Sequence, residues 1–280
     1  MSLPPDFQFS QASLQDYVDC PRRFQLRYLL RVEWPAIEAE PALESERHLQ
    51  QGNAFHRLVH QHLLGIPEER LLDVVADEDL RRWWYNYLTL PPADLPATRY
   101  PEVVLSAPLG GYRLVAKYDL VAVDAGQRIK IVDWKTYRKR PRHKWLVDRL
   151  QTRVYPYLLV QAGAHLNAGR PLQPEQVEMV YWYAKFPETP ERLPYDAAQY
   201  EADGVYLASL VEEIEGEVER LGEADFPLTF HERRCNYCPY RSLCRRGAQA
   251  GAIEEIEEES DVGDDFDISL DLEQIAEIEY

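Results

Sequence analysis

The stretch Ile129-Lys-Ile-Val-Asp-Trp-Lys-Thr136 decides the fold, because it is a β-rich run that ends in alternating charged and apolar side chains. In an extended strand, successive side chains point to opposite faces, so Asp133 and Lys135 are expected on one face and Trp134 on the other. A carboxylate and an ammonium group would then meet at one spot. By itself, an Asp-x-Lys pair is also typical of a solvated salt bridge at a strand edge.

A second β-rich run, Tyr112 to Val123, precedes this strand and carries Asp119 near its middle. The connection at residues 124–127 predicts a hairpin that brings Asp119 alongside Asp133. Two carboxylates and one backbone carbonyl, that of Trp134, would form the oxygen-rich site that Mg²⁺ or Mn²⁺ prefers. Such a metal activates a bound water and neutralises charge on a phosphorane, as hydrolysis of a phosphodiester requires.

Helical patterns surround the β-rich region. We expect helices over Gly52 to Leu64, residues 78–88, Leu146 to Leu159 and Val205 to Leu221, and a further strand over Glu178 to Phe186. These elements indicate an α/β (α+β) fold, in which a sheet is flanked by helices.

Three helical residues are candidates for the same site. His56 could complete the metal shell with an imidazole, although a lone histidine is also typical of a helix surface or cap. Gln151 and Tyr155 are four residues apart, so they share a helix face that could turn toward a substrate or simply face solvent.

The four cysteines are unevenly placed: Cys20 is alone, and Cys235, Cys238 and Cys244 lie close together. Thiolates suit Zn²⁺ or an iron–sulfur cluster, and ligands from both ends of a domain would clamp its termini together. The spacing by itself leaves both metals open.

The terminal segments carry their own signals. Ser13, followed three residues later by Asp16, predicts a helix start, and Pro21 suits the first turn of a second helix. Residues 35–46 are interpreted as a connector rich in Pro and Glu. Residues 251–280 are expected to be disordered, because they have few apolar groups relative to charge.

The net charge of −17 is concentrated near the C-terminus, where residues 254–279 contain 13 acids. Residues 1–246 hold 35 acids and 31 bases, a net charge of −4 (31 minus 35). A basic run follows the first strand described above, with Tyr137 and Trp145 on either side; it consists of Arg138, Lys139, Arg140, Arg142, His143 and Lys144. It could attract phosphates while the aromatic rings stack on bases, or it could be a solvated loop.

Other signals narrow the class of protein. No run of eighteen apolar residues and no secretory signal is present, which predicts a cytoplasmic protein with no membrane partner. The chain also lacks the Gly-x4-Gly-Lys-Ser/Thr loop of ATP-driven helicases, so any unwinding would need another protein.

These motifs resemble the RecB-type branch of the PD-(D/E)XK nucleases in identity and order. The matching pieces are Gly52-x3-His56, Asp119 in Lys-Tyr-Asp-Leu-Val, Asp133-Trp-Lys135 and Gln151-x3-Tyr155. The resemblance implies that His56, Asp119 and Asp133 bind the catalytic metal and that Lys135 is the catalytic lysine. Gln151 and Tyr155 would form the accessory motif near the substrate.

The outer frame resembles the iron–sulfur staple of AddB-type nucleases and of small CRISPR-associated nucleases. It consists of residues 10–24 around Cys20-Pro21 and the motif Cys235-x2-Cys238-Pro239-x4-Cys244. The resemblance implies a 4Fe–4S cluster. The chain departs from the pattern at His60, where relatives often have an acidic residue, and we expect His60 to face solvent. Glu102 could join the metal site through a water, but a structural role at the strand end is favoured.

Together, the patterns and the resemblance predict a restriction-endonuclease-like core with a mixed sheet flanked by helices, and terminal segments joined by a four-cysteine cluster. The expected parts are an N-terminal helical segment (1–50), a nuclease core (51–225), a cysteine segment (226–250) and an acidic tail (251–280). The expected function is metal-dependent exonuclease cleavage of single-stranded DNA ends, in repair, recombination or CRISPR adaptation. A helicase or a CRISPR integrase is a possible partner. The alternatives are a silent module that binds DNA or a helicase, and a zinc-stabilised scaffold.

Overall fold

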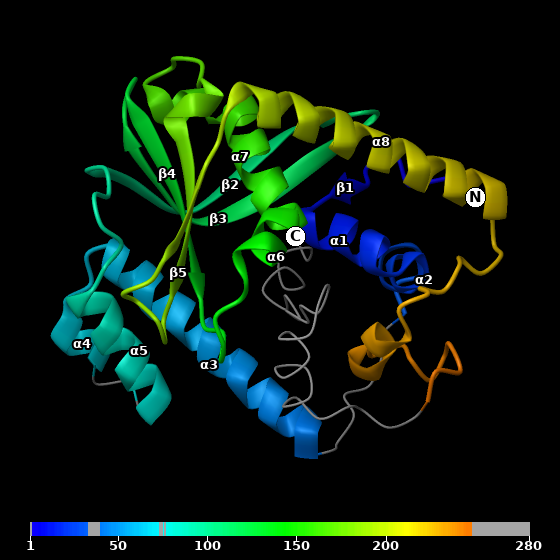
Figure 1. Cartoon of the computed structure of the whole chain (residues 1–280), viewed down its shortest axis with the longest axis horizontal. Helices are drawn as coiled ribbons and strands as arrows, with labels where there is room; N and C mark the ends of the chain where they lie inside the picture. Colours follow the sequence, from blue (N-terminus) through cyan, green and yellow to red (C-terminus); the bar gives the residue numbers. More distant parts are fainter. Residues whose placement is uncertain (1, 33–39, 73–74, 76, 248–280) are drawn as a thin grey trace. The chain divides into compact units, whose positions relative to one another are not determined.

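The computed structural model describes residues 2–32, 40–72, 75 and 77–247 (Figure 1). These residues form two compact units, which are described separately. The first unit takes its residues from 1–47, 108–114 and 206–280, and the second from 48–107 and 115–205.

A mixed sheet is the framework of the second unit. β3 (Tyr112–Asp124) pairs antiparallel with β4 (Arg128–Lys135), β4 pairs parallel with β5 (Val177–Tyr183), and β5 pairs antiparallel with β6 (Glu191–Pro194). β2 (Thr98–Leu109) also pairs with β3. A parallel pair needs a crossover connection, and α6 (His143–Asp148) and α7 (Leu150–Ala162) provide it between β4 and β5.

Both faces of the central strands are covered, which explains why β4 is an almost continuous run of buried residues. On one face, Trp134 and Trp182 join a core cluster with Phe55 from α3 (Glu40–Leu63) and Trp83 from α5 (Glu78–Thr89). On the other face, the Tyr181 hydroxyl lies 2.7 Å from Thr152 Oγ1 on α7. The prediction of a mixed sheet flanked by helices is therefore confirmed.

Shorter elements complete the second unit. They are α4 (Glu68–Leu72) and two 3₁₀ turns at Gly163–Asn167 and Pro174–Gln176. α8 (Ala197–Leu221) begins in the second unit and continues into the first.

The first unit contains elements from both ends of the described chain. They are β1 (Gln8–Phe9), α1 (Gln11–Asp19), α2 (Pro21–Phe24), a π-helical turn at Gln25–Leu29 and a 3₁₀ turn at Glu232–Tyr237. β1 pairs in parallel with the start of β3, where Phe9 faces Leu114.

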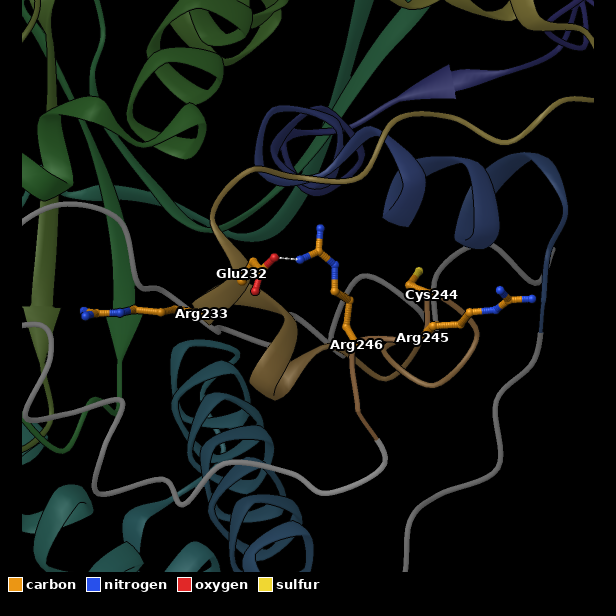
Figure 2. A pocket seen from close by; sticks show the side chains of 5 residues that line it. All are labelled: Glu232, Arg233, Cys244, Arg245 and Arg246. Carbon is orange, nitrogen blue, oxygen red and sulfur yellow. Dashed lines mark hydrogen bonds and ion pairs between the residues drawn. The ribbon is translucent and has the colours of Figure 1, made fainter.

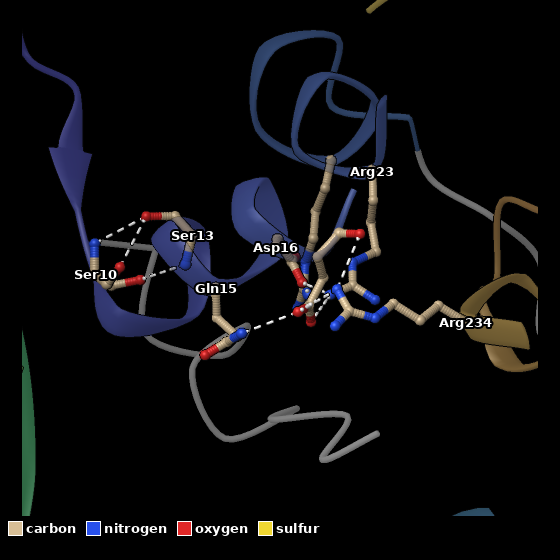
Figure 3. A network of polar contacts seen from close by, with 8 residues as sticks. Ser10, Ser13, Gln15, Asp16, Arg23 and Arg234 are labelled. Atoms are coloured by element: carbon tan, nitrogen blue, oxygen red, sulfur yellow. Dashed lines mark hydrogen bonds and ion pairs between the residues drawn. The ribbon is translucent and has the colours of Figure 1, made fainter. Parts of the chain in front are cut away.

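A buried ion network links the N-terminal helices to the 3₁₀ turn in the first unit (Figure 3). The Arg23 guanidinium lies 2.7 Å from Asp16 and 2.8 Å from Asp19. Arg234 donates to the Asp19 carboxylate at 2.9 Å and to the Asp19 carbonyl at 3.2 Å. Because the charges are paired within a mostly buried cluster, removing one partner would leave an uncompensated charge.

Several predicted boundaries were wrong. The cap of α1 is Ser10, not Ser13: the Ser10 side chain accepts from the Ser13 N–H, and the Ser13 hydroxyl accepts from the Ser10 N–H (Figure 3). α3 begins at Glu40, within the predicted connector, and residues 33–39 lie outside the described residues.

Two other helices also differ from prediction. The single helix predicted over 146–159 is two helices, because Arg149 between them is extended (φ −69°, ψ 139°). α8 starts at Ala197 instead of Val205.

The acidic tail at 251–280 lies outside the described residues. Among the helices that the structure describes, none is long and apolar enough to cross a membrane.

Candidate active site

The candidate site forms in the second unit where β3 and β4 stop pairing. The ladder between them ends with Leu120 opposite Val132, one residue before Asp119 and Asp133. The Trp134 N–H, beyond the end of this ladder, donates to Asp119 Oδ2 at 2.8 Å. The end of the ladder therefore turns the Asp119 carboxylate toward the backbone of β4.

His56 reaches this carboxylate from α3. Its Nδ1 lies 3.2 Å from Asp119 Oδ1, and both side chains are largely buried. Gly52, one turn earlier, packs against the end of β4: a Cβ added there would lie 3.1 Å from the Thr136 hydroxyl. A glycine thus allows the close approach that positions His56.

Asp133, Lys135 and Gln151 form the other half of the site. Gln151 Nε2 donates to Asp133 Oδ1 at 2.6 Å, and Gln151 Oε1 accepts from Lys135 Nζ at 3.0 Å. Lys135 Nζ also lies 2.8 Å from Asp133 Oδ2. Both oxygens of the buried Asp133 carboxylate therefore face a polar group: Oδ1 faces the Gln151 amide and Oδ2 faces the Lys135 ammonium.

The pKa values of the two carboxylates are shifted in opposite directions. Burial raises the pKa of Asp133 to about 6, Lys135 opposes this rise, and the neighbouring Asp119 adds to it. Burial also works against the charged form of Asp119, but His56, the Trp134 N–H and Lys135 outweigh it and hold the pKa of Asp119 below its ordinary value. The structure thus favours one anion at Asp119 and makes a second at Asp133 costly without added positive charge.

The remaining predicted residues have clear positions. The Trp134 side chain is buried in the core cluster, on the face opposite Asp133. The Tyr155 ring is buried against the Tyr118 ring with centroids 4.8 Å apart, and its carbonyl accepts from the Tyr118 hydroxyl at 2.9 Å. The structure therefore brings His56, Asp119, Asp133, Lys135 and Gln151 together, and it packs Tyr155 against β3.

Glu102 and His60 were also considered for the metal site on sequence grounds. Glu102 is ion-paired with Lys117, two positions before Asp119, and has a left-handed backbone (φ 53°) inside β2. That conformation is uncommon for a residue with a Cβ and marks a local distortion of the strand. His60, one turn after His56, is half-buried.

The donors at the site fit a hard divalent cation. Two carboxylates and an imidazole lie together in a buried site, and added positive charge would stabilise the second carboxylate charge beside Asp119. Within the ranges that the structure describes, no group of three or more His, Cys, Asp or Glu side chains already has the arrangement that holds a metal ion. The carboxylates are engaged instead by His56, Gln151, Lys135 and the Trp134 N–H.

The four cysteines lie in the first unit and have free thiols. Burial raises the pKa of Cys235, and neighbouring Cys20 and Cys244 raise it further. Burial also raises the pKa of Cys238 to about 11. These shifts indicate that Cys20, Cys235 and Cys244 lie near one another, and thiols are donors of zinc and iron–sulfur sites, but within the described part of the chain they do not already have the arrangement of a metal site.

Two arginines beside the cysteines were missed by the sequence reasoning. Arg23 lowers the pKa of the Cys238 thiol, and Arg22, which hydrogen-bonds Cys244, lowers that of Cys244, although burial keeps both pKa values raised overall. Their position directly after Cys20-Pro21 was the feature of the sequence that could have identified them.

Cys244 also lines a polar cavity of about 590 Å³ within the first unit (Figure 2). Arg246 is ion-paired with Glu232 across it, and Arg233 and Arg245 complete the lining.

The family model of the PD-(D/E)XK nuclease superfamily matches residues 8–245. The chain belongs to this superfamily. The match spans the sheet, His56, both aspartates and all four cysteines, and it supports a nuclease.

Solved structures give a more distant likeness. The crystal structure of SSO0001 is 14% identical, with 85% of each chain covered and a TM-score of 0.40. A protein from Eubacterium rectale, named as a candidate exonuclease, is 12% identical over 88% of this chain and 91% of its own, with a TM-score of 0.43. No curated protein sequence matches the chain.

Proposed function

We propose that the protein is a Mg²⁺- or Mn²⁺-dependent DNA exonuclease of the RecB-like branch of its superfamily, acting on single-stranded ends. The observation that carries this proposal is the convergence of His56, Asp119 and Asp133 in one buried site, with Lys135 and Gln151 at the Asp133 carboxylate. Two buried carboxylates side by side favour a bound cation, because added positive charge offsets their repulsion, and membership of the PD-(D/E)XK nuclease superfamily indicates the reaction.

The residues have separate tasks in this proposal. His56, Asp119, Asp133 and the Trp134 carbonyl would hold the cation, which when bound supplies an activated water and neutralises phosphate charge. Lys135 stabilises negative charge at the phosphate, and Gln151 fixes Lys135 and Asp133 relative to each other through its two hydrogen bonds. Tyr155 on α7 supports the site through Tyr118, the β3 residue before Asp119.

We propose that the four cysteines hold a 4Fe–4S cluster outside the nuclease core of residues 51–225. The gathering of free thiols in the first unit supports a metal there, and the nearby Arg22 and Arg23 would offset the negative charge of bound thiolates. Brown protein with visible absorption is expected. Colourless protein containing one zinc per chain would contradict the cluster but leave the nuclease proposal standing.

The biological setting is proposed from the sequence resemblance. A cytoplasmic role in DNA repair, recombination or CRISPR adaptation, with a helicase or integrase as partner, follows from it.

End-labelled single-stranded DNA tests the enzymatic proposal directly. We expect release of labelled products only when Mn²⁺ or Mg²⁺ is added, and no release by Asp133→Ala. Tight DNA binding with no metal-dependent cleavage by the wild-type protein would instead support a silent DNA- or helicase-binding module.

A further inference from the structure

A positively charged segment follows β4 directly. Residues 138–149 contain six Lys and Arg and a single acid, Asp148, although the chain as a whole carries a net charge of −17. The segment starts three residues after Lys135 and contains α6. The segment therefore carries a local net charge of +5 (six minus one) beside the candidate active site, within a chain that is acidic as a whole.

A row of aromatic and cationic groups leads from Lys135 through this segment. Lys135 Nζ lies 5.7 Å from the centre of the Tyr137 ring. The Tyr137 and Trp145 rings are 6.4 Å apart and nearly perpendicular. The Arg149 guanidinium lies 4.9 Å from the centre of the Trp145 ring. Tyr137, Trp145 and Arg149 are all partly exposed, so a ligand can reach them.

The segment is anchored to the sheet. Glu191, the first residue of β6, accepts from Arg140 at 2.8 Å and lies 2.5 Å from His143. The Thr152 hydroxyl on α7 donates to the Leu146 carbonyl at 2.5 Å, which fixes α6 to α7. These contacts hold Trp145 in place before any ligand arrives and so lower the entropy cost of binding.

We propose that Tyr137, Trp145 and Arg149 form a binding site for an unpaired nucleobase next to Lys135. A base stacks on an aromatic ring whatever its sequence, and an arginine over the same ring adds cation–π attraction and can contact a phosphate. Bases of a duplex are already stacked on one another and would not enter. The site therefore selects single strands without reading sequence. Its place beside the scissile phosphate rests on the proposed function, whose preference for single strands it would explain.

The test is binding of labelled DNA by the full-length protein without added divalent metal, so that no cleavage occurs. Three probes are compared: a short oligothymidylate, a fully abasic strand of the same length, and a blunt duplex. We expect the wild-type protein to bind the thymidylate about tenfold more tightly than the abasic strand.

Two variants at one position separate stacking from folding. Trp145→Leu fills much of the same space without an aromatic face and is expected to bind both single strands equally. Trp145→Phe keeps a ring and is expected to retain most of the preference for bases. The matched control is Tyr85→Ala, because Tyr85 is 64% exposed on α5 and does not belong to the row; it should leave all three affinities unchanged.

The inference is overturned if Trp145→Leu still prefers the thymidylate, or if Tyr85→Ala loses the preference to the same degree. It is also overturned if wild-type protein binds abasic and base-bearing strands alike. Failure of the nuclease proposal gives a different result: no metal-dependent cleavage of end-labelled DNA, with the dependence on bases and on Trp145 intact.

Discussion

The two candidate metal sites differ in how the chain assembles them. Asp119, Asp133 and Lys135 come from two adjacent strands, and the hairpin ladder sets their separation. Cys20 and Cys235 are 215 positions apart (235 minus 20) and meet only after both ends of the chain have folded. The first site is a local consequence of sheet pairing, and the second is a long-range closure of the first unit.

The two sites also differ in how their charges are balanced. Asp133 is buried beside a second carboxylate and has a raised pKa, although Lys135 is ion-paired with it. Around the cysteines, the buried carboxylates of Asp16 and Asp19 are matched by Arg23 and Arg234. We infer that the carboxylate site sacrifices stability for chemistry, whereas the cysteine region contributes stability.

The largest expected effect concerns Asp133→Asn. Cleavage should fall by about 1,000-fold or more, because a metal-based rate enhancement of several kcal/mol is lost. The melting temperature should stay constant or rise, since the substitution removes a costly buried charge. End-labelled DNA assays and thermal melts on the same samples measure both quantities. Asp124→Asn, at the end of β3, is the control; a large drop in melting temperature for Asp133→Asn would contradict the contrast between the sites.

Cys20→Ser should show the opposite pattern. Loss of a closure over 215 residues is expected to cost about 3–4 kcal/mol, or roughly 10 °C in melting temperature. Below the transition, the folded protein should still bind Mn²⁺ as the wild type does. Val18→Ser, at an exposed position of α1 just before Cys20, serves as the control. An unchanged melting temperature with full loss of Mn²⁺ binding would show that the sites are not separate.

Arg23→Gln tests the charges around the cysteines. Its loss leaves Asp16 and Asp19 without one partner and removes a positive charge near Cys238. We expect a strong chelator to extract the cysteine-bound metal about tenfold faster, a typical effect of losing an outer-shell partner. Absorbance or a zinc indicator follows the release. Arg31→Gln, which alters an exposed arginine of the first unit, should release metal at the wild-type rate.

The smallest expected effect is that of Gly52→Ala. The gain in helix propensity, about 1 kcal/mol, should offset the contact of the new methyl group with the Thr136 hydroxyl, so stability changes little. Cleavage should nonetheless fall several-fold, because Thr136 adjoins Lys135 and must shift. Single-turnover rates measure this change. A loss of stability with an unchanged rate would show that Gly52 serves packing rather than the site.

Much of the fold could be predicted from the sequence, since the alternation of side chains along a strand or helix depends only on residues that are neighbours in the chain. The alternation in Asp133-Trp-Lys135 set the faces of β4, and the short turn at 124–127 set the antiparallel pairing of β3 and β4. The positions at which helices are interrupted were harder to predict. Arg149 is a good helix former, yet it is extended between α6 and α7, where the Thr152 hydroxyl bonds the Leu146 carbonyl across the break.

The side-chain network of the site was also beyond sequence reasoning. Spacing placed Gln151 on a helix face, but its simultaneous contacts with Asp133 and Lys135 depend on how α7 lies over β4. The cation–π contact of Arg149 with Trp145 had a signal, since the two residues are four apart. Glu191 had none, because it is far along the chain from the basic segment that it anchors.

Calorimetric titration of Mn²⁺ tests most directly the claim that His56, Asp119 and Asp133 form a hard cation site. We expect saturable binding by the wild-type protein, no binding at this site by Asp133→Asn, and wild-type affinity for Cys20→Ser. Equal Mn²⁺ affinity in wild-type protein and Asp133→Asn would contradict the assignment.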